Sequence, residues 1–256
     1  MIKAVFFDID GTLLSHASGG IPESARTSLS LLRQRGVKLF LATGRHILEI
    51  HRLPVGPLPF DGYVTLNGQI CLDGREALLW DAPFAAADTE AMVSLFRQRE
   101  VPAMLVERDR LYINYVDEAV RLAQAAISTP IPPLGDYAGG RLYQLIVYDS
   151  GDRAAALLGR LPGCKMSRWN AHAVDILPKS GGKVAGIRHL LDHFHLEPHE
   201  IMAFGDGEND VDMLRCAGVG IAMGNGVSQI REAADYVTED IDQDGVFRAL
   251  RRYGLI

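Results

Sequence analysis

The sequence predicts an α/β fold in which helices cover both faces of a parallel sheet. Short apolar segments alternate with helical patterns towards both ends of the chain, which is the order typical of a parallel sheet with helical connections. Each of these apolar segments is followed by polar residues or glycine, as expected where buried strands end at the ligand-binding edge of such a sheet. The middle of the chain has a different pattern, and we therefore expect an inserted α+β unit over residues 82–178, with residues 1–81 and 179–256 forming the core.

The core is expected to contain buried strands with helices between them. Pro22 and Glu23 begin a segment with apolar residues at helical spacing, and Gly36 ends it, which are the start and stop signals of a helix. A further helix is expected over residues 184–194, directly after Lys183. The expected strands are residues 3–7, 37–42, 63–66, 201–204 and 219–222.

The insert is expected to place some strands next to each other without a helix between them, which is typical of an α+β unit. Expected helices are residues 87–99, 118–127 and 152–161, and expected strands are residues 103–107, 111–115, 142–148 and a final pair around Asn170 and Ala171.

Composition excludes several classes of function. The 256 residues are 48% hydrophobic and 23% charged, which suits one large or two modest globular domains. The chain has 26 Lys and Arg against 32 Asp and Glu, which gives a net charge of -6. A protein with this charge balance lacks the basic surface that binds a nucleic-acid backbone. We therefore expect no nucleic-acid partner.

Cysteine spacing and hydropathy predict where the protein acts. Cys71, Cys164 and Cys216 lie far apart, so they predict neither a disulfide framework nor a zinc site and favour a reducing compartment. No segment approaches the roughly 20 apolar residues that cross a bilayer, and Asp8 interrupts the only apolar run near the start. The sequence therefore predicts a cytoplasmic protein without a membrane partner.

A pair of carboxylates follows the first strand. Asp8 and Asp10 stand two residues apart and are followed by Gly11 and Thr12. Two carboxylates this close repel each other unless a cation or a shared proton relieves them, which favours a functional site. The alternative is capping of the turn that ends the strand, where aspartate is common. The pair alone leaves both interpretations open.

A second polar cluster strengthens the functional interpretation. Residues 205–210 read Gly-Asp-Gly-Glu-Asn-Asp and follow the strand at 201–204. Their oxygens are the hard ligands that Mg²⁺ prefers over histidine or cysteine. Asn209 or Asp210 could instead be the N-cap of the helix that runs to Cys216, but a cap does not need so many polar groups.

Two further elements fit a phosphate site. Thr43 follows the second strand and offers a hydroxyl and a backbone amide, although an ordinary helix N-cap is the alternative. Lys183 begins a helix, where a solvated surface charge is the alternative to a cation that steadies carboxylates and grips phosphate. The glycines before Lys183 lack the remaining residues of a Walker loop, and those at 218–224 miss the GxGxxG spacing. A nucleotide cradle is therefore not supported.

These motifs together resemble those of a known family. Residues 8–14, residues 43–45, Lys183 and residues 205–210 are similar, in this order, to the four motifs of the haloacid dehalogenase-like (HAD) superfamily of phosphohydrolases. The large insert, Asn67-Gly68 and residues 221–225 resemble the Cof-type branch with a type 2 cap. The resemblance spans nearly the whole chain. Lys179 competes with Lys183 for the third motif, and Lys183 fits better because it begins the helix.

The resemblance implies a Rossmann-like core and an Mg²⁺-dependent phosphatase. Asp8 would be the nucleophile that attacks phosphorus, and Asp10 would protonate the leaving group and then deprotonate water. Mg²⁺ would be bound by Asp8, Asp206 and the backbone carbonyl of Asp10. Thr43 and Lys183 would bind phosphoryl oxygens.

The remaining site residues are expected to bind or orient. Asn209 and Asp210 would orient Lys183, the phosphate and metal-bound water. Arg45 would hold the substrate or a cap residue, with a surface salt bridge as the alternative. The residues expected to contact substrate are Thr12, Gly44, Arg45 and Asn209.

The insert would be a lid that closes over the site and contacts the non-phosphate part of the substrate. Candidate contacts are Asn114, Trp169, Asn170 and His172, each with a structural role as the alternative, such as a core anchor for Trp169 and a turn residue for His172.

The expected partner is a small phosphorylated metabolite, such as a sugar phosphate or a phosphorylated cofactor, and the expected state is a monomer or small homo-oligomer. Alternative functions are a phosphomutase, which would release no phosphate, and a non-enzymatic phosphate-sensing module, which would not need Asp8 and Asp10.

Overall fold

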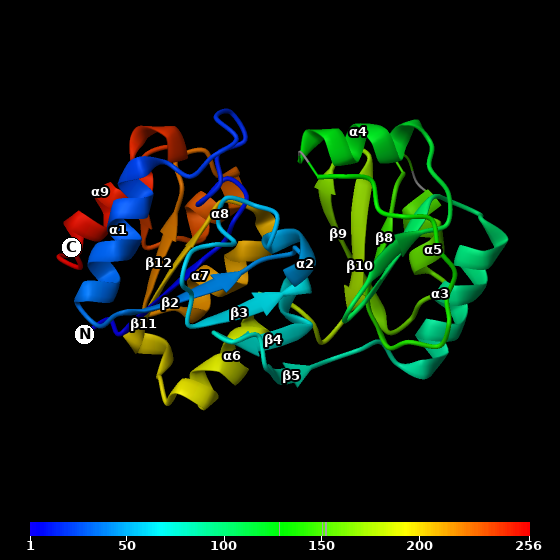
Figure 1. Ribbon diagram of the computed structural model, residues 1–256, viewed down its shortest axis with the longest axis horizontal. Helices are drawn as coiled ribbons and strands as arrows, with labels where there is room; N and C mark the ends of the chain where they lie inside the picture. Colours follow the sequence, from blue (N-terminus) through cyan, green and yellow to red (C-terminus); the bar gives the residue numbers. More distant parts are fainter. Residues whose placement is uncertain (128, 150, 152) are drawn as a thin grey trace. The chain divides into compact units, whose positions relative to one another are not determined.

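The computed structural model describes residues 1–127, 129–149, 151 and 153–256 (Figure 1). The chain forms two compact units, of which the first contains Met1–Asp81 and Gly182–Ile256 and the second contains Ala82–Gly181. No helix among these residues has the length and apolar character needed to span a membrane.

The first unit is built on an eight-stranded sheet in the order β13-β12-β11-β1-β2-β3-β4-β5. Its strands from β13 to β3 are parallel, whereas β4 and β5 add to the edge in antiparallel fashion. The strands are β1 (Ala4–Phe7), β2 (Lys38–Ala42), β3 (Gly62–Thr65), β4 (Ile70–Asp73), β5 (Leu78–Asp81), β11 (Ile201–Gly205), β12 (Val219–Ala222) and β13 (Tyr236–Val237). The α/β class predicted from the sequence is confirmed.

Helices cover both faces of this sheet. On one face α1 packs against α9, and on the other α6 packs against β3, β4 and β5 while α7 packs against β11 and β12 (Figure 1). The helices are α1 (Glu23–Gln34), α2 (Ile47–Ile50), α6 (Lys183–Phe194), α7 (Val211–Cys216), α8 (Ser228–Ala233) and α9 (Gly245–Arg252).

The central strand β1 has both faces buried, which explains why it reads as a continuous apolar run. All four of its residues are inaccessible to solvent. Phe6 stacks on Phe40 of β2 with ring centroids 4.7 Å apart, and Phe7 stacks on Phe204 of β11 at 5.2 Å. This packing fixes β1 between its neighbours and leaves Asp8 as the first residue beyond the strand.

The antiparallel edge of the sheet was not expected from the sequence. The strands β4 and β5 are joined by a tight turn in which the Asp73 carboxylate accepts hydrogen bonds of 2.8 Å from the backbone N–H groups of Arg75 and Ala77. Each strand has four residues, as β1 does, but the two form an antiparallel hairpin, whereas the prediction followed the alternation of strands and helices that is typical of a parallel sheet.

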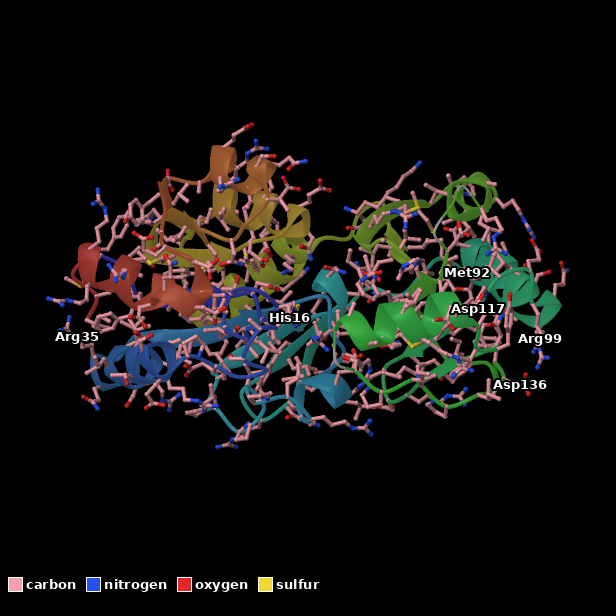
Figure 2. The ribbon with its side chains drawn as sticks, turned by 90° about the horizontal axis from the view of Figure 1, so that it is seen from above. His16, Arg35, Met92, Arg99, Asp117 and Asp136 are labelled. Atoms are coloured by element: carbon pink, nitrogen blue, oxygen red, sulfur yellow. The ribbon has the colours of Figure 1, made fainter. Side chains whose placement is uncertain are left out.

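The second unit is an antiparallel five-stranded sheet with helices, as the α+β pattern predicted. Its strand order is β7-β6-β8-β10-β9. Met92 of α3 belongs to its buried core, and Asp117 caps α4 by accepting a hydrogen bond from Val120 N (Figure 2). The elements are α3 (Ala86–Gln98), β6 (Ala103–Glu107), β7 (Leu111–Ile113), α4 (Glu118–Ala126), β8 (Leu142–Val147), α5 (Arg153–Leu158), β9 (Cys164–Asn170) and β10 (Ala173–Pro178).

The predicted helix over 152–161 is shorter in the structure. It ends at Leu158, ahead of a turn at Gly159 and of Pro162, since glycine is a poor helix former and proline cannot continue a helix. Its expected first residue, Asp152, lies outside the described residues.

Candidate active site

The loop after β1 places Asp8 at the carboxyl edge of the sheet. Asp8 N still donates to Phe204 O of β11 at 3.0 Å, and the chain then turns so that Ile9 O accepts from the backbone N–H groups of Thr12, Leu13 and Leu14. Gly11 lies within this turn at φ +76°.

Gly11 is required by two separate features. Its positive φ is unfavourable for residues with a Cβ, and a Cβ at this position would lie 2.2 Å from Asp206 Oδ2. The glycine therefore allows the carboxylate of the fourth motif to approach the backbone of the first.

Three carboxylates and one ammonium group form the centre of the site. Asp8, Asp206 and Asp210 each offer an oxygen within 4.8 Å of the others. Lys183 Nζ donates to Asp8 Oδ1 at 2.6 Å and to Asp210 Oδ1 at 2.5 Å. Lys183 is only 2% exposed. The predicted alternative of a solvated surface lysine is therefore wrong, because Lys183 bridges two buried carboxylates.

Burial and charge shift the protonation of this centre. Burial raises the pKa of Asp8 well above its ordinary value; Lys183 opposes this shift, and the neighbouring carboxylates add to it. Burial, together with the charge of Asp210, raises the pKa of Asp206 to about 7. Burial alone would lower the pKa of Lys183, but the carboxylates of Asp210 and Asp8 outweigh it and raise that pKa. An added positive charge would therefore stabilise the ionised forms of Asp8 and Asp206.

The donor set fits a divalent, oxygen-preferring cation. When the three carboxylates are ionised, Lys183 balances one of their charges and two remain. Carboxylate oxygens are the ligands that Mg²⁺ selects. The cluster contains Asp8 and Asp206, as predicted, and it contains the Asp210 carboxylate, which was expected only to orient neighbouring groups.

The Asp10 carboxylate lies outside this cluster and is held by Arg45. Arg45 Nε donates to Asp10 Oδ2 and Arg45 Nη2 to Asp10 Oδ1, both at 2.6 Å. Burial would lower the pKa of Arg45, but the hydrogen bonds and charge of Asp10 outweigh it and raise that pKa. His16 Nε2 lies 3.3 Å from Asp10 Oδ1 on the loop that follows (Figure 2).

Thr43 supports the turn after β2. Its Oγ1 accepts a hydrogen bond of 3.2 Å from Arg45 N, and a hydroxyl that accepts in this way keeps its own proton to donate. The alternative of Thr43 as a helix N-cap is wrong, because the side chain of His46 caps α2 through Leu48 N. Gly44 lies directly against Asn67.

The fourth motif directs two side chains back into the site. Asp210 stands at the N-cap position of α7 but makes no cap bond there; its Oδ2 accepts from Asp206 N at 3.2 Å and from Gly207 N at 3.0 Å. Asn209 is exposed and its Nδ2 donates to Asn67 Oδ1 at 3.0 Å. Asn209 makes no cap bond, whereas Asp210 closes a capping box with Gly207 N at the short helical turn of residues 208–210, ahead of α7.

Two expected substrate contacts have structural partners instead. Thr12 is fully buried and its hydroxyl donates to Asp206 Oδ1 at 3.4 Å, so it supports that carboxylate. Asn114 is 5% exposed; its Oδ1 accepts from Ala103 N, and its Nδ2 donates to Phe96 O and Val101 O. These bonds fix the start of β6, and Asn114 is corrected to a structural residue of the second unit.

The other candidates of the insert lie around one irregular hairpin. The pairing of β9 with β10 shifts between Ala173 and Val174, which leaves Trp169 in a β-bulge. Trp169 is partly buried and its Nε1 donates to Asp175 Oδ1 at 2.8 Å. His172 lies in the turn, where Asn170 Oδ1 accepts from His172 N at 2.9 Å. Bulges often re-aim a side chain near a site.

Three residues of the site were missed as individual participants by the sequence reasoning. His16 carries no signal, since a lone histidine in a polar loop is common. Asn67 was noted only as part of a turn, although asparagine before glycine is typical of a left-handed backbone. Asn225 was noted only within a motif; its Nδ2 donates to Gly11 O at 2.8 Å and its Oδ1 accepts from Ile241 N at 2.9 Å.

The fold and the site define an α/β protein with a carboxylate and lysine centre at the carboxyl edge of its parallel sheet. The chain belongs to the haloacid dehalogenase-like hydrolases, whose family pattern matches residues 5–250. The Cof-type resemblance is confirmed, and the protein is a phosphatase.

Relatives in sequence and in structure agree with this assignment. An HMP-PP phosphatase of Escherichia coli O8 (strain IAI1) is 31% identical over 250 residues, which cover 90% of this chain and 87% of that protein. The phosphatase BT1666 from Bacteroides thetaiotaomicron has a TM-score of 0.90 at 29% identity, covering 100% of this chain and 96% of that chain. The HAD subclass IIB sugar phosphatase BT4131 has a TM-score of 0.86 at 31% identity, covering 99% of this chain and 100% of that chain.

Proposed function

We propose that this protein is an Mg²⁺-dependent phosphatase that hydrolyses small-molecule phosphomonoesters through a phosphorylated Asp8. The observation that carries the proposal is the bridge made by Lys183 between Asp8 and Asp210, with Asp206 in the same cluster and Asp10 two residues beyond Asp8. A binding module would not need a buried carboxylate so close to a cation site, because burying an ionised group is costly.

Asp8 is the nucleophile in this proposal. One of its carboxylate oxygens forms a bond to phosphorus while the bond from phosphorus to the ester oxygen breaks. Lys183 holds Asp8 Oδ1 at 2.6 Å, which fixes the orientation of the carboxylate for this attack. Loss of the ester oxygen leaves an aspartyl phosphate on Asp8.

Asp10 is the general acid and base. It gives a proton to the departing ester oxygen, and it then takes a proton from the water that attacks the phosphorylated Asp8 and releases phosphate. Arg45 holds both oxygens of Asp10 and so keeps this carboxyl group in one orientation. Arg45 is therefore a positioning residue for Asp10 in addition to a candidate substrate contact.

Hydrogen-bond donors in fixed positions stabilise the negative charge on the phosphoryl oxygens. Thr43 contributes a hydroxyl proton, Lys183 an ammonium group, and the backbone at Gly44 and the exposed amide of Asn209 complete the set. Asp210 orients Lys183 through the 2.5 Å contact. Thr12 contributes indirectly by supporting Asp206.

Asp8, Asp206 and Asp210 are the carboxylates available to Mg²⁺, and the backbone carbonyl of Asp10 is proposed as a further ligand. The ion would offset the repulsion between the anionic nucleophile and the anionic phosphoryl group. Its positive charge also compensates the burial that raises the pKa values of Asp8 and Asp206.

Residues 82–178 are proposed to act as a cap that contacts the non-phosphate part of the substrate. The substrate class is a small phosphorylated metabolite, since relatives of this chain are named for HMP-PP and for sugar phosphates. The hairpin with Trp169, Asn170 and His172 supplies the candidate contacts. The cytoplasmic location and the monomeric or small homo-oligomeric state stay predictions.

The test is a phosphate-release assay over a panel of sugar phosphates and phosphorylated cofactors, with Mg²⁺ and with excess chelator. Release of phosphate that chelation stops and Mg²⁺ restores supports the proposal. Conversion of one sugar phosphate into another without free phosphate would identify a phosphomutase. Full activity in chelator would contradict the role of Mg²⁺.

A further inference from the structure

The turn that connects β3 to β4 is strained, and it lies beside the active site. Leu66, Asn67 and Gly68 have successive φ values of +51°, +53° and +93°. Leucine in this left-handed region is unusual, and such strain persists only where the surrounding structure enforces it. Leu66 and Asn67 are 2% and 3% exposed, so contacts within the protein enforce the conformation of this turn.

The backbone of the turn is bonded to the second motif. Leu66 N donates to Arg45 O at 3.2 Å, and Asn67 N donates to Thr43 O at 2.9 Å. These bonds fix the segment that presents the Thr43 hydroxyl and the Arg45 guanidinium group. The left-handed conformation of the turn therefore helps to hold the backbone of the second motif in place.

The side chain of Asn67 connects the second motif to the fourth. Its Oδ1 accepts the 3.0 Å hydrogen bond from Asn209 Nδ2. A Cβ at Gly44 would lie 3.1 Å from Asn67 Nδ2 and 3.3 Å from Oδ1, so the amide lies directly against the Gly44 backbone.

Gly68 brings the same turn against the third motif. A Cβ on Gly68 would lie 2.1 Å from Gly182 O and 3.2 Å from Lys183 N. The turn thus contacts the start of α6, from which Lys183 reaches Asp8 and Asp210.

We propose that Asn67 is a positioning residue that sets the spacing of Thr43, Lys183 and Asn209, the phosphate-binding groups of the site. In this proposal it acts through Asn209 and through the backbone of residues 43–45. This inference rests on the proposed function, because it assumes that these groups bind the phosphoryl oxygens.

The test separates the side chain of Asn67 from its strained backbone. Asn67→Gly keeps the left-handed backbone available, so the variant should still fold, and loss of the buried amide should lower its stability by a small amount that urea denaturation measures. We expect kcat/KM for p-nitrophenyl phosphate to fall about 10- to 100-fold, and inhibition by inorganic phosphate to weaken.

A double-mutant cycle gives a readout that general destabilisation would not produce. Asn209→Ala should lower kcat/KM and phosphate affinity by a similar factor, and Asn67→Gly with Asn209→Ala should lose little more than either alone. The matched control is His195→Gly, which replaces another left-handed residue, exposed at the C-cap of α6, and should leave activity unchanged.

The outcomes distinguish this inference from the function on which it rests. If wild type hydrolyses the ester and Asp8→Asn does not, but Asn67→Gly keeps kcat/KM and phosphate inhibition within about twofold, Asn67 has no positioning role. Fully additive losses in the cycle would also overturn it. If wild type releases no phosphate, the proposed function itself is wrong.

Discussion

Arg45 holds Asp10 through two hydrogen bonds of 2.6 Å, one to each oxygen of the carboxylate. A planar guanidinium group fixes a carboxylate both in position and in orientation. Arg45 is itself anchored, since its backbone N–H donates to Thr43 Oγ1 and its carbonyl accepts from Leu66 N. The orientation of Asp10 is therefore determined by a residue of the second motif.

Arg45→Lys should reduce the acid function of Asp10 while the fold is kept. A lysine makes a single point contact in place of the bidentate pair, so we expect kcat to fall about 10- to 100-fold for alkyl phosphates. Aryl phosphates, whose leaving groups need less protonation, should lose much less. Steady-state kinetics on glycerol phosphate and p-nitrophenyl phosphate measure the difference. Equal losses on both esters would show that Arg45 does not act through Asp10.

Asp8→Asn should abolish turnover without lowering stability. An amide occupies the same space but cannot attack phosphorus, so the loss should exceed the roughly 10²- to 10⁴-fold typical of an acid or base. Burial raises the pKa of Asp8, which means that its charge is costly in the folded state. We therefore expect an unchanged or higher melting temperature without Mg²⁺. Turnover within tenfold of wild type would refute the covalent route.

Lys183→Met should destabilise the protein as well as inactivate it. The substitution leaves the carboxylates of Asp8 and Asp210 buried without their cation. Breaking such a pair costs about 3–5 kcal/mol in the free energy of unfolding, measurable by urea denaturation. Adding Asp8→Asn to Lys183→Met should recover part of that loss, because one uncompensated charge is removed. A single variant as stable as wild type would mean that the carboxylates are protonated or otherwise compensated.

The metal-free protein should become less stable as the pH rises from about 4 to about 7. The unfolded chain ionises Asp206 near its ordinary pKa of 3.8, whereas the folded protein holds the proton until about pH 7. The unfolded state therefore binds fewer protons in this window, and the free energy of unfolding falls with pH, by an amount on the order of a few kcal/mol. Above pH 7 this contribution is constant.

Urea denaturation in chelator between pH 4 and 8 measures this slope. Asp206→Asn should flatten it, and the difference between the two proteins removes the contribution of other ionisable groups. Mg²⁺ should stabilise wild type little at pH 5 and strongly at pH 8, since the cation binds the ionised carboxylates. Identical slopes for wild type and Asp206→Asn would show that Asp206 is not the titrating group.

The hairpin of the second unit should affect specificity more than catalysis. Trp169→Ala or His172→Ala should change the ranking of substrates, while hydrolysis of a small aryl phosphate should change little. Asn114→Ala is the contrasting variant: it removes buried hydrogen bonds and should lower stability without changing the ranking. A uniform loss on every substrate would assign Trp169 and His172 to folding or closure. An unchanged ranking would place specificity elsewhere.

The sequence predicted the elements whose local pattern is strong. Apolar runs followed by polar residues located β1, β2, β3, β11 and β12, because strands buried on both faces of a parallel sheet are predominantly apolar. The strands β4 and β5 are no shorter than β1, but they were missed because they pair antiparallel at the sheet edge, outside the alternation of strands and helices that guided the prediction. Their pairing depends on the Asp73 turn and on burial against α6.

The site was predictable in its residue types but not in its pairings. The carboxylates that follow the strands predicted a cluster at this edge of the sheet. The ion pairs of Asp10 with Arg45 and of Asp210 with Lys183 depend on side-chain directions, which spacing in the sequence does not determine. Asn114 was wrongly predicted to contact substrate. A polar residue near a strand is typical of a binding site, and only its bonds to buried backbone groups show that it is structural.

The position of β1 between β2 and β11 has a consequence for synthesis on the ribosome. One edge of β1 stays unpaired until β11, which begins at Ile201, has emerged, whereas the sheet of the second unit is complete once Pro178 has emerged. A nascent chain folds its earlier segments first, and an unpaired apolar strand edge invites association with other chains. Chaperone binding during translation would therefore be most useful before β11 appears, when a chain that ends at Pro178 holds one finished sheet and a central strand that still lacks a neighbour.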